Sequence, residues 1–302
     1  MNKIEFGDCR EIMRLWKEQG IKAQTCVTSP PYYGLRDYGH DGQIGLEETP
    51  EEYIAAMVEV FRCVRDVLED DGTVWLNIGD SYNGSNGQGT KPNIMSKEAA
   101  EGRGGKAIKV DGIKSKDLIG IPWMLAFALR ADGWYLRQDI IWHKPNPMPE
   151  SVQDRCTKSH EYIFLLSKSP KYYYDNEAIK DPVKQDWGTR DRKDGKYHNE
   201  GTGLQPHSGL EKSYEMANKR SVWTVNTKPY AGAHFAVFPT ELIEPCILAG
   251  APVGGIVLDP FMGSGTTAQV AQNLGRQYLG CELNEDYKSL QEKRLSQLSL
   301  VL

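Results

Sequence analysis

The feature that most constrains the fold of this chain is a glycine-rich turn late in the sequence. The strand-forming run GGIVLD ends at Asp259 and leads into Gly263-x-Gly265-x-x-Ala268, where a helical pattern begins. The next strand-forming run closes on Glu282, 19 positions after Gly263. Such glycines let the backbone approach a ligand, the helix N-terminus offers N–H donors, and a carboxylate at this spacing accepts from ribose hydroxyls. The pattern predicts a nucleotide-like ligand; the alternative is a tight turn whose glycines serve only packing.

Three details of the turn narrow the choice of ligand. No lysine follows the glycines, which argues against a P-loop. A dinucleotide site would place its first glycine directly after the strand, whereas Asp-Pro-Phe-Met intervenes here. A carboxylate at Asp259 suits a cationic group, such as the ammonium of a methionine moiety, and Phe261 can pack beside it. These details favour S-adenosylmethionine, and an NAD-binding oxidoreductase is the alternative from another functional class.

Composition sets the broad class of the protein. The 302 residues are 39% hydrophobic and 25% charged, which is typical of a globular protein with a sizeable core. No apolar run approaches the roughly 18–20 residues of a membrane span, so we expect a cytoplasmic protein without a membrane partner. The six cysteines are scattered, with neither a CxxC pair nor a histidine cluster, which predicts buried free thiols and no metal site.

Charge is unevenly distributed. The net charge of −5 argues against a surface wholly committed to nucleic acid. Residues 82–116, however, carry seven lysines and arginines against three acids, among many glycines. This composition predicts a long mobile loop, and its charge can hold a phosphate backbone.

Strand and helix patterns alternate along the chain. Strands are predicted from the runs KIEFGD, AQTCVT, TVWLNIGD, GWYLRQDIIWHKPN, HEYIFLLSKSPKYYYD, GGIVLD and RQYLGCEL. Helices are predicted at about 9–19, 50–68, 117–131, 240–249 and 263–274, and a last one opens at Asn284. The second helix begins with a capping box formed by Thr49 and Glu52. The alternation predicts an α/β fold with a doubly wound, mostly parallel sheet, and the irregular residues 176–228 predict an inserted module.

A second unusual stretch, TCVTSPPYYGLRDYG, lies near the N-terminus. By itself it predicts only a turn at the end of a strand. Together, Thr28-Ser-Pro-Pro-Tyr32 and Asp259-Pro-Phe-Met-Gly-Ser-Gly-Thr-Thr267 resemble the catalytic and cofactor motifs of the DNA amino-methyltransferases, which methylate cytosine N4 or adenine N6. Because the catalytic motif precedes the cofactor motif, the chain resembles the permuted β group of that family. The resemblance covers most of residues 1–175 and 220–290.

The resemblance implies a Rossmann-like, circularly permuted fold that binds S-adenosylmethionine. It divides the chain into a catalytic half (1–175, with the basic loop 82–116), a target-recognition region (176–228) and a cofactor-binding half (229–302). Asp8 would receive the adenine amine of the cofactor, and Phe238 and Pro239 would wall its site. The remaining cofactor residues implied by the resemblance are Asp259, Phe261, Gly263, Gly265, Thr266 and Glu282.

The resemblance also implies a chemistry for the Ser-Pro-Pro-Tyr motif. An exocyclic amino nitrogen is a poor nucleophile, and the Ser29 hydroxyl and the Pro30 carbonyl can each accept one of its hydrogens. The fixed φ angles of Pro30 and Pro31 hold these acceptors, and Tyr32 offers a flat face to a base flipped out of the duplex. In the family the Ser form is associated mainly with cytosine and the Asp form mainly with adenine. Ser29 therefore favours cytosine N4, with adenine N6 as the alternative.

Contacts with the substrate are expected outside this motif as well. Arg36 and Lys144 are candidate DNA-binding residues, although a structural salt bridge for Arg36 and a solvated surface position for Lys144 are alternatives. Trp187 and Trp223 can stack against DNA, but core positions are more common for tryptophan. The resemblance implies double-stranded DNA as substrate and is compatible with a homodimer. The recognition sequence, and whether a cognate restriction enzyme exists, stay open.

Overall fold

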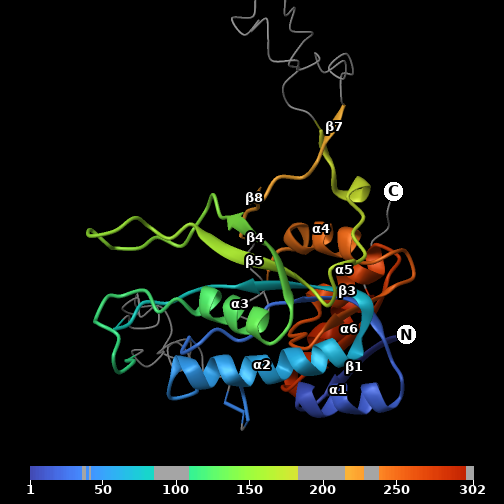
Figure 1. The fold of residues 1–302 in the computed structure, drawn as a ribbon, viewed down its shortest axis with the longest axis horizontal. Helices are drawn as coiled ribbons and strands as arrows, with labels where there is room; N and C mark the ends of the chain where they lie inside the picture. The colour runs from blue at the N-terminus through green and yellow to red at the C-terminus, as the bar shows by residue number, and fades with distance from the viewer. Residues whose placement is uncertain (36–38, 41, 85–108, 183–214, 228–237, 297–302) are drawn as a thin grey trace, which may run out of the picture.

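The computed structural model describes residues 1–35, 39–40, 42–84, 109–182, 215–227 and 238–296 (Figure 1). The α-helices in these ranges are α1 (Cys9–Glu18), α2 (Pro50–Val67), α3 (Ile121–Ala131), α4 (Thr240–Gly250), α5 (Thr266–Asn273) and α6 (Lys288–Ser296). The strands are β1 (Asn2–Phe6), β2 (Ala23–Thr28), β3 (Leu68–Ile78), β4 (Tyr135–His143), β5 (His160–Ser167), β6 (Asp181–Pro182), β7 (Met216–Ala217), β8 (Val222–Thr224), β9 (Ile256–Asp259) and β10 (Gln277–Glu282). Short 3-10 turns, η2 (Glu177–Ile179) and η4 (Glu285–Tyr287), complete the set.

Eight of the strands form one sheet in the order β1-β10-β9-β2-β3-β5-β4-β8, and β6 pairs with β7 separately. Neighbours are parallel from β1 to β3, β5 is antiparallel to both β3 and β4, and β8 is parallel to β4. The predicted mostly parallel sheet is therefore confirmed. The first strand lies beside β10, with Phe6 opposite Glu282. The two ends of the chain thus share one sheet, as a circular permutation requires.

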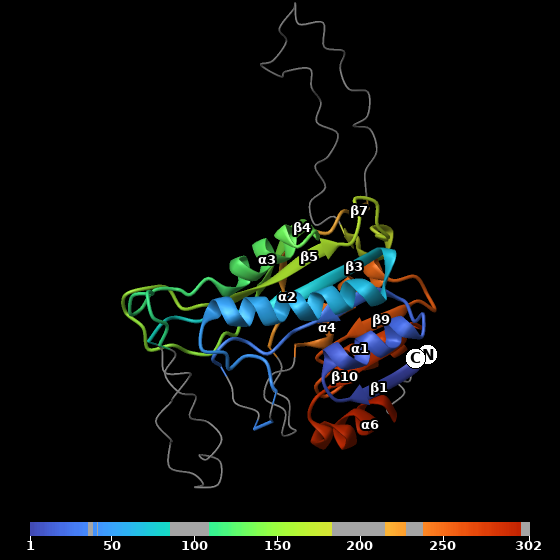
Figure 2. The ribbon, with the colours of Figure 1, turned by 60° about the horizontal axis from the view of Figure 1, so that its bottom comes forward.

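Helices cover both faces of this sheet (Figures 1 and 2): α1, α2 and α3 lie on one face, and α4 and α5 on the other. Successive residues of the central strands enter two separate apolar clusters, because side chains of a strand alternate between faces. Cys26 and Val74 pack under α1–α3, whereas Val27 and Trp75 pack under α4 and α5. Strands buried on both faces read as continuous apolar runs. The doubly wound arrangement is confirmed.

Several elements differ from their predicted bounds; β5, for example, ends at Ser167, so the residues KSPKYYYD predicted with it are not part of the strand. α3 begins at Ile121 rather than at 117, because Gly120 has a φ of 88° and the Asp80 carboxylate accepts from the N–H groups of Gly120 and Ile121. β3 begins at Leu68 directly after α2, so the residues LEDDG before the predicted run TVWLNIGD are also part of this strand. The differences in α3 and β3 reflect tertiary contacts that residue spacing does not encode.

Part of the range predicted as an inserted module, residues 176–228, belongs to the main sheet. Its last residues form β8, which pairs with the end of β4. Trp223 on β8 is buried in the cluster under α4 and α5, and its indole N–H donates to the Arg220 carbonyl. Trp223 is therefore a core residue. Trp187 and residues 183–214 lie outside the described residues, as do Arg36 and most of the basic loop.

No described helix has both the length and the apolar character needed to cross a membrane. The described ranges contain no group of three or more His, Cys, Asp or Glu residues that could hold a metal ion. All six cysteines are free, and five are buried. The prediction of buried thiols is wrong for Cys156, which is exposed in the segment between β4 and β5.

Candidate active site

The predicted glycine turn joins the carboxyl end of β9 to the start of α5. Gly263 and Gly265 have φ angles of 54° and 86°, in the left-handed region where a side chain is strained. At the end of β10 the Glu282 carboxylate accepts from the N–H of Gly263 at 2.7 Å and from the N–H of Asn284 at 2.9 Å. Burial raises the pKa of Glu282 despite these bonds. The carboxylate therefore fixes the turn as well as standing at the predicted ribose position.

One polar group in the turn has no partner. Ser264 is 2% exposed, and within the described residues its hydroxyl makes no hydrogen bond. A buried hydroxyl without a partner costs free energy, so its presence at a turn of this kind is itself a sign of a ligand. We did not predict Ser264 as a site residue, although it stands between the two glycines of the motif.

Asp259 has a structural role that the sequence did not reveal. It is 1% exposed, and one carboxylate oxygen accepts from the Thr28 hydroxyl at 2.6 Å and from the N–H of Phe261 at 3.0 Å. The other oxygen accepts from the Thr267 hydroxyl at 2.6 Å. Burial raises the pKa of Asp259 to about 6, against the lowering effect of these bonds. Both oxygens are bound inside the protein, and contact of Asp259 with a cationic ligand group stays a prediction.

The bond from Thr28 to Asp259 has a topological consequence. Thr28 ends β2 and directly precedes the Ser-Pro-Pro-Tyr motif, while Asp259 ends β9 and begins the cofactor motif. β2 and β9 are parallel neighbours, so their carboxyl ends lie at the same edge of the sheet. Two motifs 231 residues apart in sequence are thus joined by one hydrogen bond between threonine and aspartate.

Asp8 lies at this same edge. It follows β1 as the N-cap of α1, and the N–H of the preceding Gly7 donates to the Glu282 carbonyl at 2.8 Å. The Asp8 carboxylate pairs with the Arg10 guanidinium at 2.5 Å, which lowers the pKa of Asp8. The structure therefore brings Asp8 and Glu282 to adjacent strand ends, as predicted, but with Arg10 bound to Asp8.

The two residues predicted to wall the cofactor site come just before α4. Pro239 is the buried N-cap residue of α4, and its carbonyl accepts from the N–H of Leu242 at 3.1 Å. Phe238 is half-buried against the apolar cluster under α4 and α5. Phe261 in the turn is half-buried against the other cluster. Contact of these rings with a ligand stays a prediction.

The Ser-Pro-Pro-Tyr loop is held from below by α2. Tyr53 of α2 is fully buried, and its hydroxyl donates to the Pro31 carbonyl at 2.9 Å. Tyr33 is buried with its ring 5.6 Å from that of Tyr53, so it belongs to the core. Ser29 and Tyr32 are only half-buried, whereas Pro30 is buried. The side chains predicted to meet the substrate are thus the more accessible ones in this loop.

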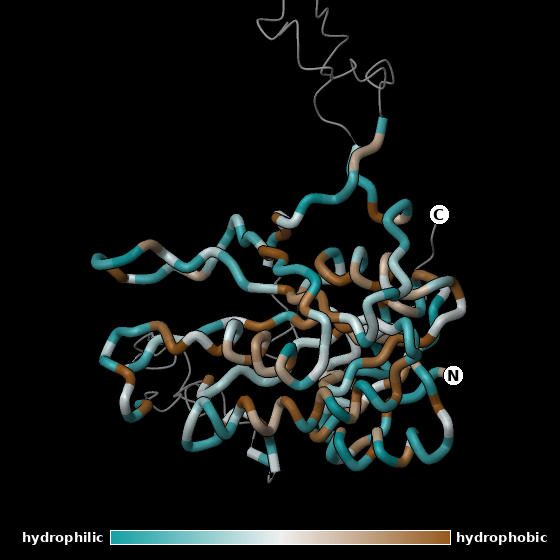
Figure 3. Tube along the Cα trace, in the orientation of Figure 1, coloured by the Kyte–Doolittle hydropathy of each residue, from teal (hydrophilic) through white to brown (hydrophobic). Residues whose placement is uncertain are grey.

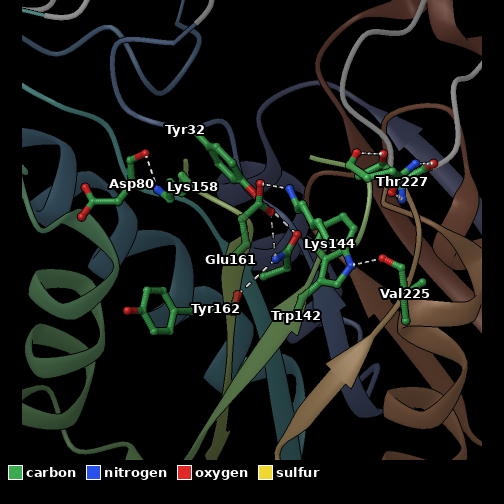
Figure 4. A network of polar contacts seen from close by, with 11 residues as sticks. Tyr32, Asp80, Trp142, Lys144, Lys158, Glu161, Tyr162, Val225 and Thr227 are labelled. Atoms are coloured by element: carbon green, nitrogen blue, oxygen red, sulfur yellow. Dashed lines mark hydrogen bonds and ion pairs between the residues drawn. The ribbon is translucent and has the colours of Figure 1, made fainter. Parts of the chain in front are cut away.

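Tyr32 is fixed by a polar network that the sequence did not reveal (Figure 4). Its hydroxyl donates to the Glu161 carboxylate at 2.9 Å and lies 3.4 Å from the Asn77 side-chain oxygen. Burial and the charge of Glu161 raise the pKa of Tyr32, while a hydrogen bond with the Ser29 side chain acts in the opposite direction. The ring also lies so close to Gly79 that a Cβ there would be 2.7 Å from Tyr32 Cε2.

Lys144 belongs to this network. Its ammonium is ion-paired with the second oxygen of Glu161 and lies 4.1 Å from the centre of the Trp142 ring. The Trp142 indole N–H donates in turn to the Val225 carbonyl at 2.9 Å. Figure 4 shows the Lys144 side chain directed at Glu161 and Tyr32. A DNA contact by Lys144 stays a prediction, but its ammonium is already ion-paired with Glu161.

A signal for Glu161 was present in the sequence. The residue is the one acid in HEYIFLLS, a strand that is otherwise apolar after its first residues, and His-Lys ends the preceding strand. An acid and a base at facing ends of an antiparallel pair predict an ion pair. The sequence patterns predict the two strands but not that they pair with each other, so the ion pair was not predicted.

The family follows from the comparisons with known proteins. A family model described as a DNA methylase, of the N6 and N4 methyltransferase type, matches residues 23–293. The chain belongs to this DNA methylase family. It is 49% identical over 296 residues to the type II methyltransferase M.SmaI of Serratia marcescens, covering 97% of this chain and 90% of that protein. It is 48% identical to M.Cfr9I of Citrobacter freundii, covering 96% and 86%.

Solved structures share the fold of this DNA methylase. The PvuII DNA methyltransferase, described as cytosine-N4-specific, aligns with a TM-score of 0.64 at 16% identity, over 100% of this chain and 88% of that one. A complex of M1.HpyAVI with S-adenosylmethionine aligns with a TM-score of 0.57 at 19% identity, over 98% and 100%. At these identities the likeness concerns the architecture alone.

Proposed function

We propose that this DNA methylase transfers a methyl group from S-adenosylmethionine to the exocyclic N4 of a flipped cytosine at a specific site in double-stranded DNA. The observation that carries the proposal is the hydrogen bond between Thr28 and Asp259, because it joins the Ser-Pro-Pro-Tyr loop to the glycine turn. Family membership and the similarity to the type II methyltransferases support the reaction class.

The turn fits the proposed cofactor. The left-handed Gly263 and Gly265 leave room for a ligand, Ser264 presents a buried hydroxyl in need of a partner, and Glu282 stands at the position of a ribose acceptor. A solved neighbour of the same fold is a complex with S-adenosylmethionine. When bound, S-adenosylmethionine supplies the electrophilic methyl group.

The residues of the Ser-Pro-Pro-Tyr loop act on the base. Ser29 Oγ and the Pro30 carbonyl accept the hydrogens of the amino group, so that its lone pair is directed to the methyl group rather than into the ring. Tyr32 stacks on the extruded base, which returns about 1–3 kcal/mol of the few kcal/mol that flipping costs. Positioning of the two reactants supplies much of the rate.

The choice of base is the finer part of the proposal and rests on Ser29. A neutral hydroxyl can accept from the amino group of either base, and the family model covers both N6 and N4 enzymes. Adenine N6 is therefore the second candidate, supported by the same site geometry.

One experiment tests the reaction and the base together. The protein is incubated with DNA and S-adenosylmethionine, the DNA is digested to nucleosides, and the modified base is identified by mass spectrometry. We expect N4-methylcytosine; N6-methyladenine alone would reject the cytosine assignment, and no methylated base would reject the function. In the Ser29→Ala variant we expect cofactor binding to persist while most methyl transfer is lost; unchanged turnover would contradict the role of Ser29.

Assembly and partners stay predictions. Sedimentation at several protein concentrations distinguishes a monomer from the homodimer with which the resemblance is compatible. Sequencing that locates the methylated base gives the recognition site, and digestion of the methylated DNA with candidate nucleases then tests for a cognate restriction enzyme.

A further inference from the structure

We infer that Glu161 is the positioning residue of the base-stacking ring: its carboxylate fixes where the hydroxyl end of the Tyr32 ring lies, and Lys144 keeps that carboxylate in place. The inference deepens the proposed function and rests on it, because the ring matters only if a base stacks there. Glu161 itself touches neither reactant in this arrangement; it acts through Tyr32.

The first observation is the convergence of separate elements on one carboxylate. One oxygen of Glu161 accepts from the Tyr32 hydroxyl at 2.9 Å and lies 3.4 Å from the Asn77 amide nitrogen. The other oxygen is paired with Lys144. These partners come from the catalytic loop, from β3 and from the end of β4, while Glu161 lies on β5 (Figure 4). The carboxylate therefore ties the catalytic loop to three strands of the sheet.

The second observation is the close packing around the Tyr32 ring. Gly79 carries no side chain, and a Cβ there would be 2.7 Å from the ring. The backbone just before Tyr32 is fixed by the bond from Tyr53 to the Pro31 carbonyl. With the backbone held at Pro31 and the ring edge against Gly79, the hydroxyl bond to Glu161, beside the weaker contact with Asn77, fixes where the outer end of the ring lies. A shift of the stacking face by about 1 Å can slow a reaction by up to about 100-fold.

The third observation is the pairing of charges. The side chains of Glu161 and Lys144 are each 17% exposed, so each charge is largely withdrawn from water and is compensated by the other. An ionised carboxylate is a stronger acceptor for the Tyr32 hydroxyl than a neutral group. The ion pair thus strengthens the bond that holds the ring.

The test combines a ring probe with a double-mutant cycle. 3-Fluorotyrosine is placed at position 32 of the full chain, and its fluorine resonance is recorded in the wild type, in Glu161→Gln and in Glu161→Ala. Glu161→Gln keeps the shape of the side chain and one acceptor oxygen, so it serves as the test variant if Glu161→Ala folds poorly. The control is Asp132→Asn, which removes a carboxylate that is 15% exposed and ion-paired with the more exposed Arg62, away from Tyr32. Thermal unfolding is measured for each variant.

We expect the resonance to move in both Glu161 variants, more in Glu161→Ala, and to stay fixed in the control. Single-turnover methyl transfer should fall about 10- to 100-fold in Glu161→Ala and less in Glu161→Gln, with the dissociation constant for S-adenosylmethionine changed less than about twofold. Combining Glu161→Ala with Tyr32→Phe should slow transfer no more than Tyr32→Phe alone.

Two results would overturn the inference: an unmoved resonance in Glu161→Ala, or rate losses of Glu161→Ala and Tyr32→Phe that multiply. Failure of the proposed function looks different. In that case the wild type methylates no DNA, while the resonance still reports whether Glu161 holds the ring.

Discussion

At the residue scale, Asp259 shows how a motif residue can serve structure and function at once. A carboxylate buried at 1% exposure is costly unless its oxygens are bound, and Thr28, Thr267 and the N–H of Phe261 bind them. Because desolvation outweighs these bonds, the pKa of Asp259 rises to about 6. The residue that joins the two motifs is therefore sensitive to pH.

This shift predicts a pH dependence of stability. The folded pKa lies above the ordinary value of 3.8, so the folded state binds the proton more tightly, and stability falls as pH rises from about 4 to about 6. From pH 4.5 to pH 7.5 Asp259 alone should lower the free energy of unfolding by about 2 kcal/mol. Asp259→Asn should lack this contribution. Urea unfolding of both proteins at the two pH values gives the difference; equal pH dependence in both would contradict the assignment.

Lys144 gives a second prediction at this scale. Its ammonium is engaged by Glu161 and by the Trp142 ring, so we expect it to contribute little to phosphate binding. Lys144→Met should slow methyl transfer but leave the slope of log K for DNA binding against log salt unchanged. DNA binding measured at several salt concentrations checks this. A slope smaller by about one would instead support the phosphate contact expected from the sequence.

At the scale of elements, the site is built where several elements end together. β1, β10, β9 and β2 are parallel, so Asp8, Glu282, Asp259 and Ser29 all follow carboxyl ends at one edge of the sheet. The remaining contacts come from neighbouring elements, since α2 holds the Pro31 carbonyl and β5 supplies Glu161. Helix α2 thus supports the Ser-Pro-Pro-Tyr loop from outside it.

This role of α2 can be tested with two substitutions. Tyr53→Phe removes the bond to the Pro31 carbonyl and should lower the free energy of unfolding by about 1 kcal/mol. Thr49→Ala removes the helix cap and should cost about the same. We expect only Tyr53→Phe to slow methyl transfer, because it alone frees the catalytic loop. The measurements are chemical unfolding and the single-turnover methyl-transfer rate of each variant. If Tyr53→Phe transfers methyl groups as fast as Thr49→Ala, the loop needs no support from α2.

At the scale of the whole molecule, the catalytic and cofactor halves share one sheet. β2 and β3 belong to the first half of the sequence, β9 and β10 to the last part, and they are hydrogen-bonded neighbours. The two apolar clusters each draw residues from both parts, for example Leu76 with Leu279, and Trp75 with Leu242. Neither half can complete its core alone.

We therefore expect the described core to unfold as one unit. Tryptophan fluorescence reports mainly on the clusters around Trp16, Trp75 and Trp142, and far-ultraviolet circular dichroism reports on all elements. Their denaturant transitions should coincide. Two separate transitions would mean that the cofactor half and the catalytic half are independent domains.

Much of this molecule could be predicted from local patterns. The capping box at Thr49 and Glu52 is present as expected, because both partners lie within one helical turn. Gly263 and Gly265 adopt the left-handed conformations that only glycine takes easily. The contacts of Asp259 and Tyr32 were not predictable in the same way, since their partners lie 231 and 129 residues away.

The sequence by itself determined the alternation of strands and helices, the glycine turn and the order of the two motifs, because each depends on residues close together in the chain. Only the tertiary structure decided that Asp259 binds Thr28, that Lys144 faces Glu161 and that β8 joins the sheet. The physical reason is burial: which oxygen meets which donor depends on strands that become neighbours only when the sheet has formed.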